Sequence, residues 1–163
     1  MKKFRWLYSL ALAVVAGCAI NPAELDSRLA GQTREAILAR FGQPTRIVHL
    51  ASGDRLQYCT QPNGRYAVMV DLDGSGRVVR ARQVLTAEEF ARIEVGKWTR
   101  EDVEREFGPP GIIDRVASWD GPIMNYRWYG SSEMFFWVYL DGHDVVQRTQ
   151  QGMEFFNAPN DKN

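Results

Sequence analysis

A twelve-residue segment of this chain occurs twice, and this internal repeat limits the possible folds more than any other feature. Residues 33–44 (TREAILARFGQP) and 99–110 (TREDVEREFGPP) are identical at six of twelve positions. Further matches follow at nearly the same separation: Tyr58 and Tyr126, Val70 and Val138, Asp73-Gly74 and Asp141-Gly142. A period of this length predicts two copies of one supersecondary unit. With 163 residues, the chain has room for two such units after its N-terminal segment.

Each copy begins with signals for two helices. Asn21 before Pro22, and Thr86 in a capping box with Glu89, predict short helices over 22–30 and 87–94. Each second helix has a threonine cap, a glycine stop and a proline shortly after the stop. These residues are Thr33, Gly42 and Pro44 in the first copy, and Thr99, Gly108 and Pro110 in the second.

Segments of alternating apolar and polar residues follow each pair of helices, with turn residues between them. They predict strands over 46–50, 55–60, 66–72 and 78–83, and again over 113–117, 124–129, 134–140 and 145–150. We therefore predict an α+β fold, a tandem of two αα-ββββ modules over residues 18–85 and 86–163. Each antiparallel sheet is expected to carry its helices on one face.

Residues 1–17 resemble the signal peptide of a bacterial lipoprotein. Lys2, Lys3 and Arg5 precede an uncharged run over residues 6–15 that is too short to span a bilayer. The run leads into Val-Ala-Gly-Cys18, which looks like a lipobox, in which the chain is cleaved before Cys18 and this cysteine is acylated. The alternative is an ordinary secretory signal that contains a cysteine by chance.

Acylation at Cys18 would fix the chain to a membrane, because more than one acyl chain makes attachment stable. Ala19 follows the cysteine, and in the lipoproteins that this segment resembles a residue other than aspartate there is compatible with export to the outer membrane. We therefore expect a lipid anchor on the periplasmic face of the bacterial outer membrane. The mature chain would carry 17 basic and 20 acidic side chains, and without a basic excess we expect no nucleic-acid partner.

The repeated helix carries a family resemblance. The pattern Gly-x-Thr-Arg-x6-Phe-Gly-x-Pro, from Gly31 and in looser form from Gly96, is similar to that of the SmpA/OmlA (BamE-like) lipoproteins. Those are small α+β accessories of the outer-membrane β-barrel assembly machinery, and their familiar member has one module where this chain has two. The tandem layout also resembles the β-lactamase inhibitor protein architecture, in which two modules form a continuous concave sheet.

The resemblance implies a non-enzymatic protein that binds protein partners in the cell envelope, as an accessory of barrel assembly or envelope maintenance. The alternative that it implies is a periplasmic inhibitor that occludes a hydrolase with the concave sheet face. The residues agree with a role without catalysis, because no Ser, Cys or Lys lies in a recognisable nucleophile motif.

Period-two alternation assigns strand residues to faces. Over 66–72, Tyr66, Val68, Val70 and Leu72 form an apolar face, and Arg65, Ala67, Met69 and Asp71 form the other. Over 134–140, Met134, Phe136, Val138 and Leu140 are expected to face the helices.

Phe135, Trp137 and Tyr139 would then line a face without helices, and Arg127 and Tyr129 of the neighbouring strand would extend the patch. Such rows mark contact sites, and Trp and Tyr dominate interface hot spots, so we predict a partner-binding surface. Two alternatives stand beside it: residues 151–156 or the other module cover the rings, or Trp137 is a platform for carbohydrate.

Other candidate sites have simpler interpretations. Cys59 loses its possible disulfide partner if Cys18 is acylated, and a lone strand thiol is usually a packing residue. Asp71-Leu-Asp73-Gly-Ser75 resembles the start of a calcium loop, but Arg82 stands at the position of the bidentate glutamate, which favours a hairpin turn. The two histidines, His49 and His143, have no ligand-spaced partners. We therefore expect no metal and no cofactor.

Overall fold

The computed structural model describes residues 24–154 as an α+β fold, as predicted. The elements, in chain order, are α1 (Leu25–Leu29), α2 (Arg34–Phe41), β1 (Arg46–Leu50), β2 (Gly53–Cys59), β3 (Ala67–Leu72), β4 (Val78–Gln83), α3 (Ala87–Phe90), α4 (Arg100–Phe107), β5 (Ile112–Asp114), β6 (Ile123–Tyr129), β7 (Glu133–Leu140) and β8 (Val146–Met153). They form two four-stranded antiparallel sheets, β1-β2-β3-β4 and β5-β6-β7-β8. The predicted signal peptide and Cys18 lie outside the described residues.

The predicted threonine caps are present. Thr33 accepts a hydrogen bond from the Ala36 amide, and Thr99 forms a complete capping box with Asp102. Thr86 also caps its helix, accepting from the Glu89 amide, but the predicted reciprocal bond is not formed because the Glu89 carboxylate pairs with two arginines instead. The predicted cap at Asn21 lies outside the described residues.

Some element ends differ from the prediction. The helix expected over 87–94 is α3, which ends at Phe90 because the Arg92 and Ile93 amides donate to carbonyls three residues back and tighten the chain. β5 covers three residues in place of the five expected, and β8 continues three residues beyond its predicted end.

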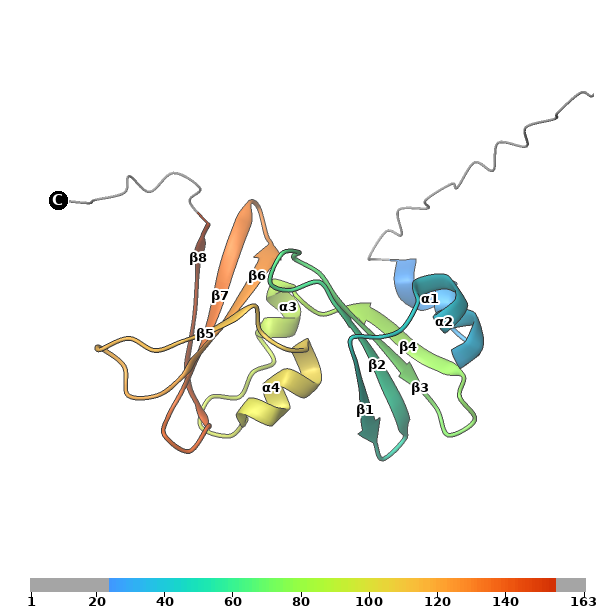
Figure 1. Cartoon of the computed structure of the whole chain (residues 1–163), viewed down its shortest axis with the longest axis horizontal. Coiled ribbons are helices and arrows are strands. Elements are labelled where there is room, and N and C mark those ends of the chain that lie inside the picture. The colour runs from blue at the N-terminus through green and yellow to red at the C-terminus, as the bar shows by residue number, and fades with distance from the viewer. Residues whose placement is uncertain (1–23, 155–163) are drawn as a thin grey trace, which may run out of the picture.

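The elements stack in four layers, which Figure 1 shows side by side: α1 with α2, the β1–β4 sheet, α3 with α4, and the β5–β8 sheet. The two sheets are separate, so the continuous concave sheet implied by the inhibitor-like layout is not formed. The expectation of helices on one face holds for β5–β8. It is wrong for β1–β4, because α4 also contacts the face opposite α1 and α2.

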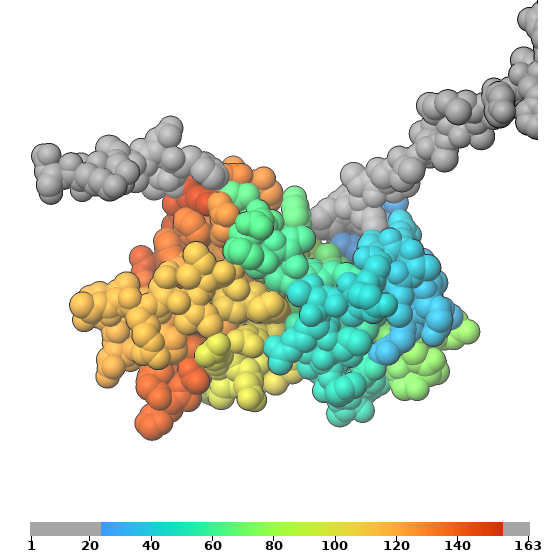
Figure 2. Space-filling view, in the orientation of Figure 1, coloured from blue at the N-terminus to red at the C-terminus, as the bar shows by residue number. Residues whose placement is uncertain are grey.

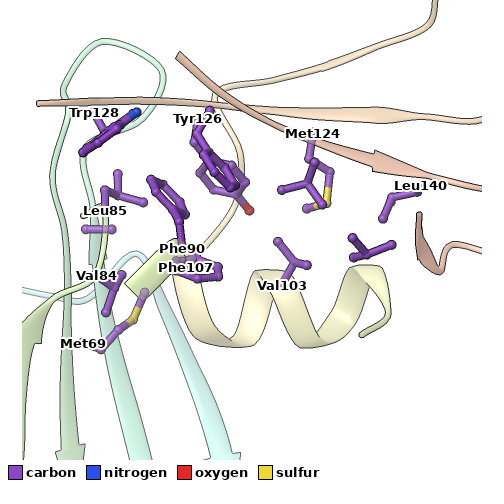
Figure 3. Close-up of a cluster of buried hydrophobic side chains, with 14 residues drawn as sticks. Met69, Val84, Leu85, Phe90, Val103, Phe107, Met124, Tyr126, Trp128 and Leu140 are labelled. Atoms are coloured by element: carbon purple, nitrogen blue, oxygen red, sulfur yellow. The ribbon is translucent and has the colours of Figure 1, made fainter. Parts of the chain in front are cut away.

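Two apolar clusters hold these layers together. The smaller one lies between α1, α2 and the β1–β4 sheet, and contains Leu29, Ile37, Leu56 and Val70. The larger one surrounds α3 and α4 and includes side chains from both sheets, such as Met69 of β3 and Tyr126 of β6, which Figure 3 shows with Phe107 of α4. Ala67 and Met69, on the second face of β3, are therefore buried against the second half of the chain.

The C-terminal end of α4 is anchored on the first sheet by buried polar groups. Gln57 is fully buried, and its amide nitrogen donates to the Glu104 and Arg105 carbonyls at 3.0 and 2.9 Å. Arg55 donates to the Arg105 carbonyl at 3.0 Å and forms ion pairs with Asp71 and Glu106. These donors satisfy carbonyls that a helix end leaves without partners. Burial disfavours ionised Glu106, but Arg55 and Arg82 outweigh it and hold its pKa below the ordinary value.

The loop between β2 and β3 joins the first half to the second half, and in Figure 2 it lies against the upper end of β6 and β7. The Gln61 side-chain amide donates to the Arg127 carbonyl at 2.6 Å and accepts from the Arg127 amide at 3.2 Å. Gln61 thus forms the same pair of hydrogen bonds with β6 that a neighbouring strand residue would form. The bonds lie two residues beyond Asn125, the last β6 residue that pairs with β5. The two halves are therefore linked both through α4 and through this loop.

Candidate functional site

The candidate site is the face of the β5–β8 sheet that points away from α3 and α4, here called the aromatic face. Phe135, Trp137 and Tyr139 lie on it in a row along β7, all partly exposed. Phe136 and Val138 alternate with them and are buried in the larger cluster, so the predicted faces of this strand are confirmed. No helix from residues 24–154 covers the aromatic face.

Trp137 is held in place by its neighbours on both sides. Its ring stacks on Phe135, with centroids 5.7 Å apart and planes at 27°. A Cβ added to Gly152 of β8 would lie 2.9 Å from two indole carbons, so one side of the indole rests against bare backbone. This packing restricts the ring before any partner binds.

Tyr139 is fixed by two residues that the sequence did not single out. Trp119, from the loop before β6, meets its ring edge to face at 5.2 Å and donates its indole N–H to the Leu140 carbonyl. The Arg148 guanidinium lies 3.9 Å from the centre of the Tyr139 ring and 5.1 Å from that of Trp119. Arg148 is the cross-strand neighbour of Tyr139, a relation that requires the strand register and is not readable from composition.

Arg127 and Tyr129 lie at one end of the aromatic row, where the second half meets the first. Arg127 bonds to the Pro62 carbonyl and to Glu154. Tyr129 is 48% exposed, and its ring contacts Tyr66 at 5.9 Å. These two predicted residues therefore form a rim between the halves, while the open row consists of the other three.

Glu154 closes this rim. Its carboxylate binds Arg127 and lies 2.8 Å from Arg65 of the first half. Burial disfavours its charge, but the two guanidinium groups outweigh burial and hold its pKa below the ordinary value. The end of β8 is thus held against the first half by charge-assisted hydrogen bonds.

A small pocket opens beside Phe135, between this rim and the β2–β3 loop. Its volume is about 140 Å³, and its walls include Pro62, Ile112, Asn125 and Phe135. A cavity of roughly 150 Å³ holds a benzene-sized group, so the pocket can accept one apolar side chain. Ile112 on its edge is 57% exposed, which extends the apolar surface onto β5.

The other candidates serve the fold. Burial raises the pKa of the Cys59 thiol, which disfavours the reactive thiolate. Asp73 accepts hydrogen bonds from the Ser75 amide and hydroxyl and from the Arg77 amide, so the hairpin-turn interpretation is confirmed. His49 contacts Asp54 at 2.6 Å beside the β1–β2 turn.

Residues 24–154 contain no cluster of three or more His, Cys, Asp or Glu side chains placed to hold a metal ion. None of the helices in this range has the length and apolar character needed to cross a membrane.

Comparisons with known proteins place the chain in no family. No family model and no curated protein matches it. Among solved structures, a DUF4309 family protein (YjgB) from Bacillus subtilis is 16% identical, with 75% of this chain and 78% of that chain covered and a TM-score of 0.32. An extracellular protein containing an SCP domain from Bacillus anthracis is 15% identical, with 94% and 50% covered and a TM-score of 0.32.

Proposed function

We propose that this chain is a non-enzymatic lipoprotein of the bacterial outer membrane that binds protein partners in the cell envelope, as an accessory of barrel assembly or envelope maintenance. Acylated Cys18 would hold it on the periplasmic face, and the aromatic face would bind the partner. The observation that carries the proposal is the row of Phe135, Trp137 and Tyr139 on a sheet face that no described helix covers.

The proposal includes a tandem of two αα-ββββ modules related to the SmpA/OmlA (BamE-like) pattern. Contacts repeated at the period of the sequence support it. The Tyr58 hydroxyl donates to the Gly42 carbonyl, and Tyr126, its counterpart in the second copy, donates in the same way to Gly108. The backbone bond from the Gly31 amide to the Val78 carbonyl is likewise repeated from the Gly96 amide to the Val146 carbonyl.

The geometry of the rings favours a polypeptide over a carbohydrate ligand. Sugar stacking needs a free ring face, but Arg148 covers a face of Tyr139 and Gly152 lies against Trp137. The aromatic face exposes ring edges and a continuous strip of apolar surface, with a small pocket beside Phe135. Aromatic anchors next to a pocket that fits one side chain are typical of protein interface hot spots.

The mechanism that follows is scaffolding. Because neighbouring residues already hold Trp137 and Tyr139, binding costs little additional ordering of these rings. A lipid anchor would restrict the protein and a membrane-bound partner to the same surface and raise their effective concentration. Binding through the aromatic face would then need no bond making or breaking.

In-cell photo-cross-linking tests the proposal directly. A photoreactive residue at Ile112, which is 57% exposed beside the pocket, should give adducts with envelope proteins. Val79, 56% exposed on the first sheet, is the matched control position. Adding Trp137→Ala should reduce the adducts at least about tenfold, because hot-spot residues contribute roughly 2 kcal/mol or more, without lowering the melting temperature by more than a few degrees.

The identity of the adducts separates the two partner classes. Capture of barrel-assembly or other envelope-maintenance proteins supports the leading proposal. Capture of a soluble periplasmic hydrolase, with its activity lost in the complex, would establish the inhibitor alternative instead. Equal adduct formation from positions 112 and 79, insensitive to Trp137→Ala, would show that the aromatic face is not a binding surface.

A further inference from the structure

The outer edge of β8 differs from the equivalent edge of the first sheet. On β4, Val78 exchanges backbone bonds with Gly31 and Gln32, and the Ala81 amide donates to the Asp26 carboxylate of α1. β8 starts in the same way, because Val146 exchanges bonds with Gly96 and Trp98.

Beyond Val146, residues 24–154 supply no further partner to the outer edge of β8. Thr149 is the counterpart of Ala81 in the second copy, and within the described range α3 provides no carboxylate to its amide. The Glu154 amide donates to the Glu133 carbonyl of β7, so Glu154 faces inward. Because backbone groups alternate along a strand, those of Thr149, Gln151 and Met153 face outward.

A groove runs along this open edge because α1 packs against β4, whereas α3 makes little contact with β8. The Phe90 ring of α3 stacks flat on Phe136 of β7, with centroids 3.9 Å apart. This position leaves a groove of about 380 Å³ between α3 and β8, lined by Ala87, Phe90, Phe136 and Thr149, among others.

Beyond the register shift opposite Tyr139 and Leu140, the edge lacks the features that usually protect a strand from pairing. Native edge strands are blocked by lysine, proline or inward-pointing charges. Residues 147–153 contain one charged side chain, Arg148, and no proline or lysine. The segment is otherwise neutral and polar, apart from Met153, whose side chain is 56% exposed.

We propose that a second copy of this chain occupies the edge, through antiparallel pairing of β8 with β8 about a two-fold axis at Gln151. In this register Gln151 faces its own copy, and Thr149 faces Met153 of the other chain. The three outward-facing residues of each chain then pair with one another, and each pair exchanges two backbone hydrogen bonds.

Side-chain complementarity selects this register. Met153 is the cross-strand partner of Met134 of β7, and both side chains lie on the helix side of the sheet. Met153 of the second copy therefore points toward the apolar groove beside Thr149. Arg148 lies opposite Glu154 of the other chain, so no like charges face one another, and the Glu154 carboxylate keeps its bonds to Arg127 and Arg65. The pairing joins two four-stranded sheets into one of eight strands, with the two aromatic rows on the same face and roughly 14 Å apart.

Cysteine cross-linking of the full-length chain tests the register. Gln151→Cys places two thiols across the axis with Cα atoms about 5.5 Å apart, within disulfide range. Gln147→Cys is the matched control, since its two copies would lie about 25 Å apart. Oxidation in the cell lysate should give at least ten times more reducible dimer for Gln151→Cys, with the unmodified chain as the background for the native cysteines.

Light scattering of the purified full-length chain in detergent tests the backbone pairing. The chain should have twice its monomer mass, and Gln151→Ala should keep that mass because the amide remains. Gln151→Pro should be monomeric with an unchanged fold by circular dichroism, since proline removes an outward N–H and leaves the bonds to β7. Equal cross-linking of the two cysteine variants, or a monomer mass for the unmodified chain at all concentrations, would overturn the proposal.

Discussion

Replacing Arg55 with methionine tests how the two halves are joined. The Arg55 side chain is 6% exposed and forms ion pairs with Asp71 and Glu106, whose side chains are 14% and 13% exposed. It also donates to the Arg105 carbonyl at the end of α4. Methionine fills similar space but leaves these acceptors without that cation.

The expected loss of stability follows from the groups left behind. Removing one partner of a buried ion pair costs about 3–5 kcal/mol. Glu106 keeps its ion pair with Arg82 at 3.1 Å, and the Asp71 and Glu106 carboxylates retain some solvent contact. The cost should therefore lie at the lower end of this range. We expect Arg55→Met to lower the free energy of unfolding by about 3 kcal/mol at neutral pH.

The loss should also depend on pH. In the native chain the pKa of Glu106 is below its ordinary value of 4.5, so its charge stabilises the fold above that pH and this contribution disappears as the pH falls through the folded-state pKa. Without Arg55, Glu106 keeps only the guanidinium groups of Arg82, Arg92 and Arg105 against the cost of burial, and its pKa rises. The difference between the two proteins should therefore be largest above about pH 5 and shrink in more acidic solution.

Urea unfolding at pH 7.5 and pH 4 measures both effects. Arg115→Met, at an exposed loop position, is the matched control and should change stability by less than about 0.5 kcal/mol. Both proteins should unfold in one transition, because the larger cluster includes side chains from both sheets. A loss below about 1 kcal/mol, or an equal loss at both pH values, would refute the view that Arg55 anchors α4.

Three further predictions concern the anchor and the fold. Cys18→Ser should release the protein from sedimented membranes, and unchanged sedimentation would contradict acylation. Gly121→Ala should cost at least about 2 kcal/mol, because φ is +150° and the new Cβ would lie 2.1 Å from a backbone oxygen, whereas Gly74→Ala has open space and should be near neutral in thermal unfolding. Tyr126→Phe should lower stability by about 1–2 kcal/mol and Tyr58→Phe by less, because the first hydroxyl bonds in a buried site and the second at the surface.

The elements that the sequence predicts best are those set by local chemistry. Threonine caps and glycine stops predict the ends of α2 and α4, where Gly42 and Gly108 adopt φ of +76° and +80°. The alternation in β7 predicts which residues are buried, because the two faces of that strand differ sharply in environment. The row of Phe135, Trp137 and Tyr139 follows from the same alternation.

What the sequence could not predict depends on contacts between distant segments. Met69 shares its face of β3 with the charged residue Asp71, and such a face is typical of a solvent-facing side until the second half covers it. Gln57 is likewise a polar strand residue whose burial makes sense only beside the carbonyls of α4. Trp119 and Arg148 join the aromatic face through a loop conformation and a cross-strand register that no local pattern specifies.

Differences between the two copies of the repeated helix help to explain why α4, and not α2, packs between the sheets. The six identical positions include the cap, the last aromatic residue and the stop, which build each helix. At a position that differs, Arg40 in the first copy is exposed, whereas its counterpart Glu106 binds Arg55 and Arg82 of the first sheet. An arginine at that point of α4 would face two buried cations. The identical residues therefore form the helix, and the substituted ones determine which surface it contacts.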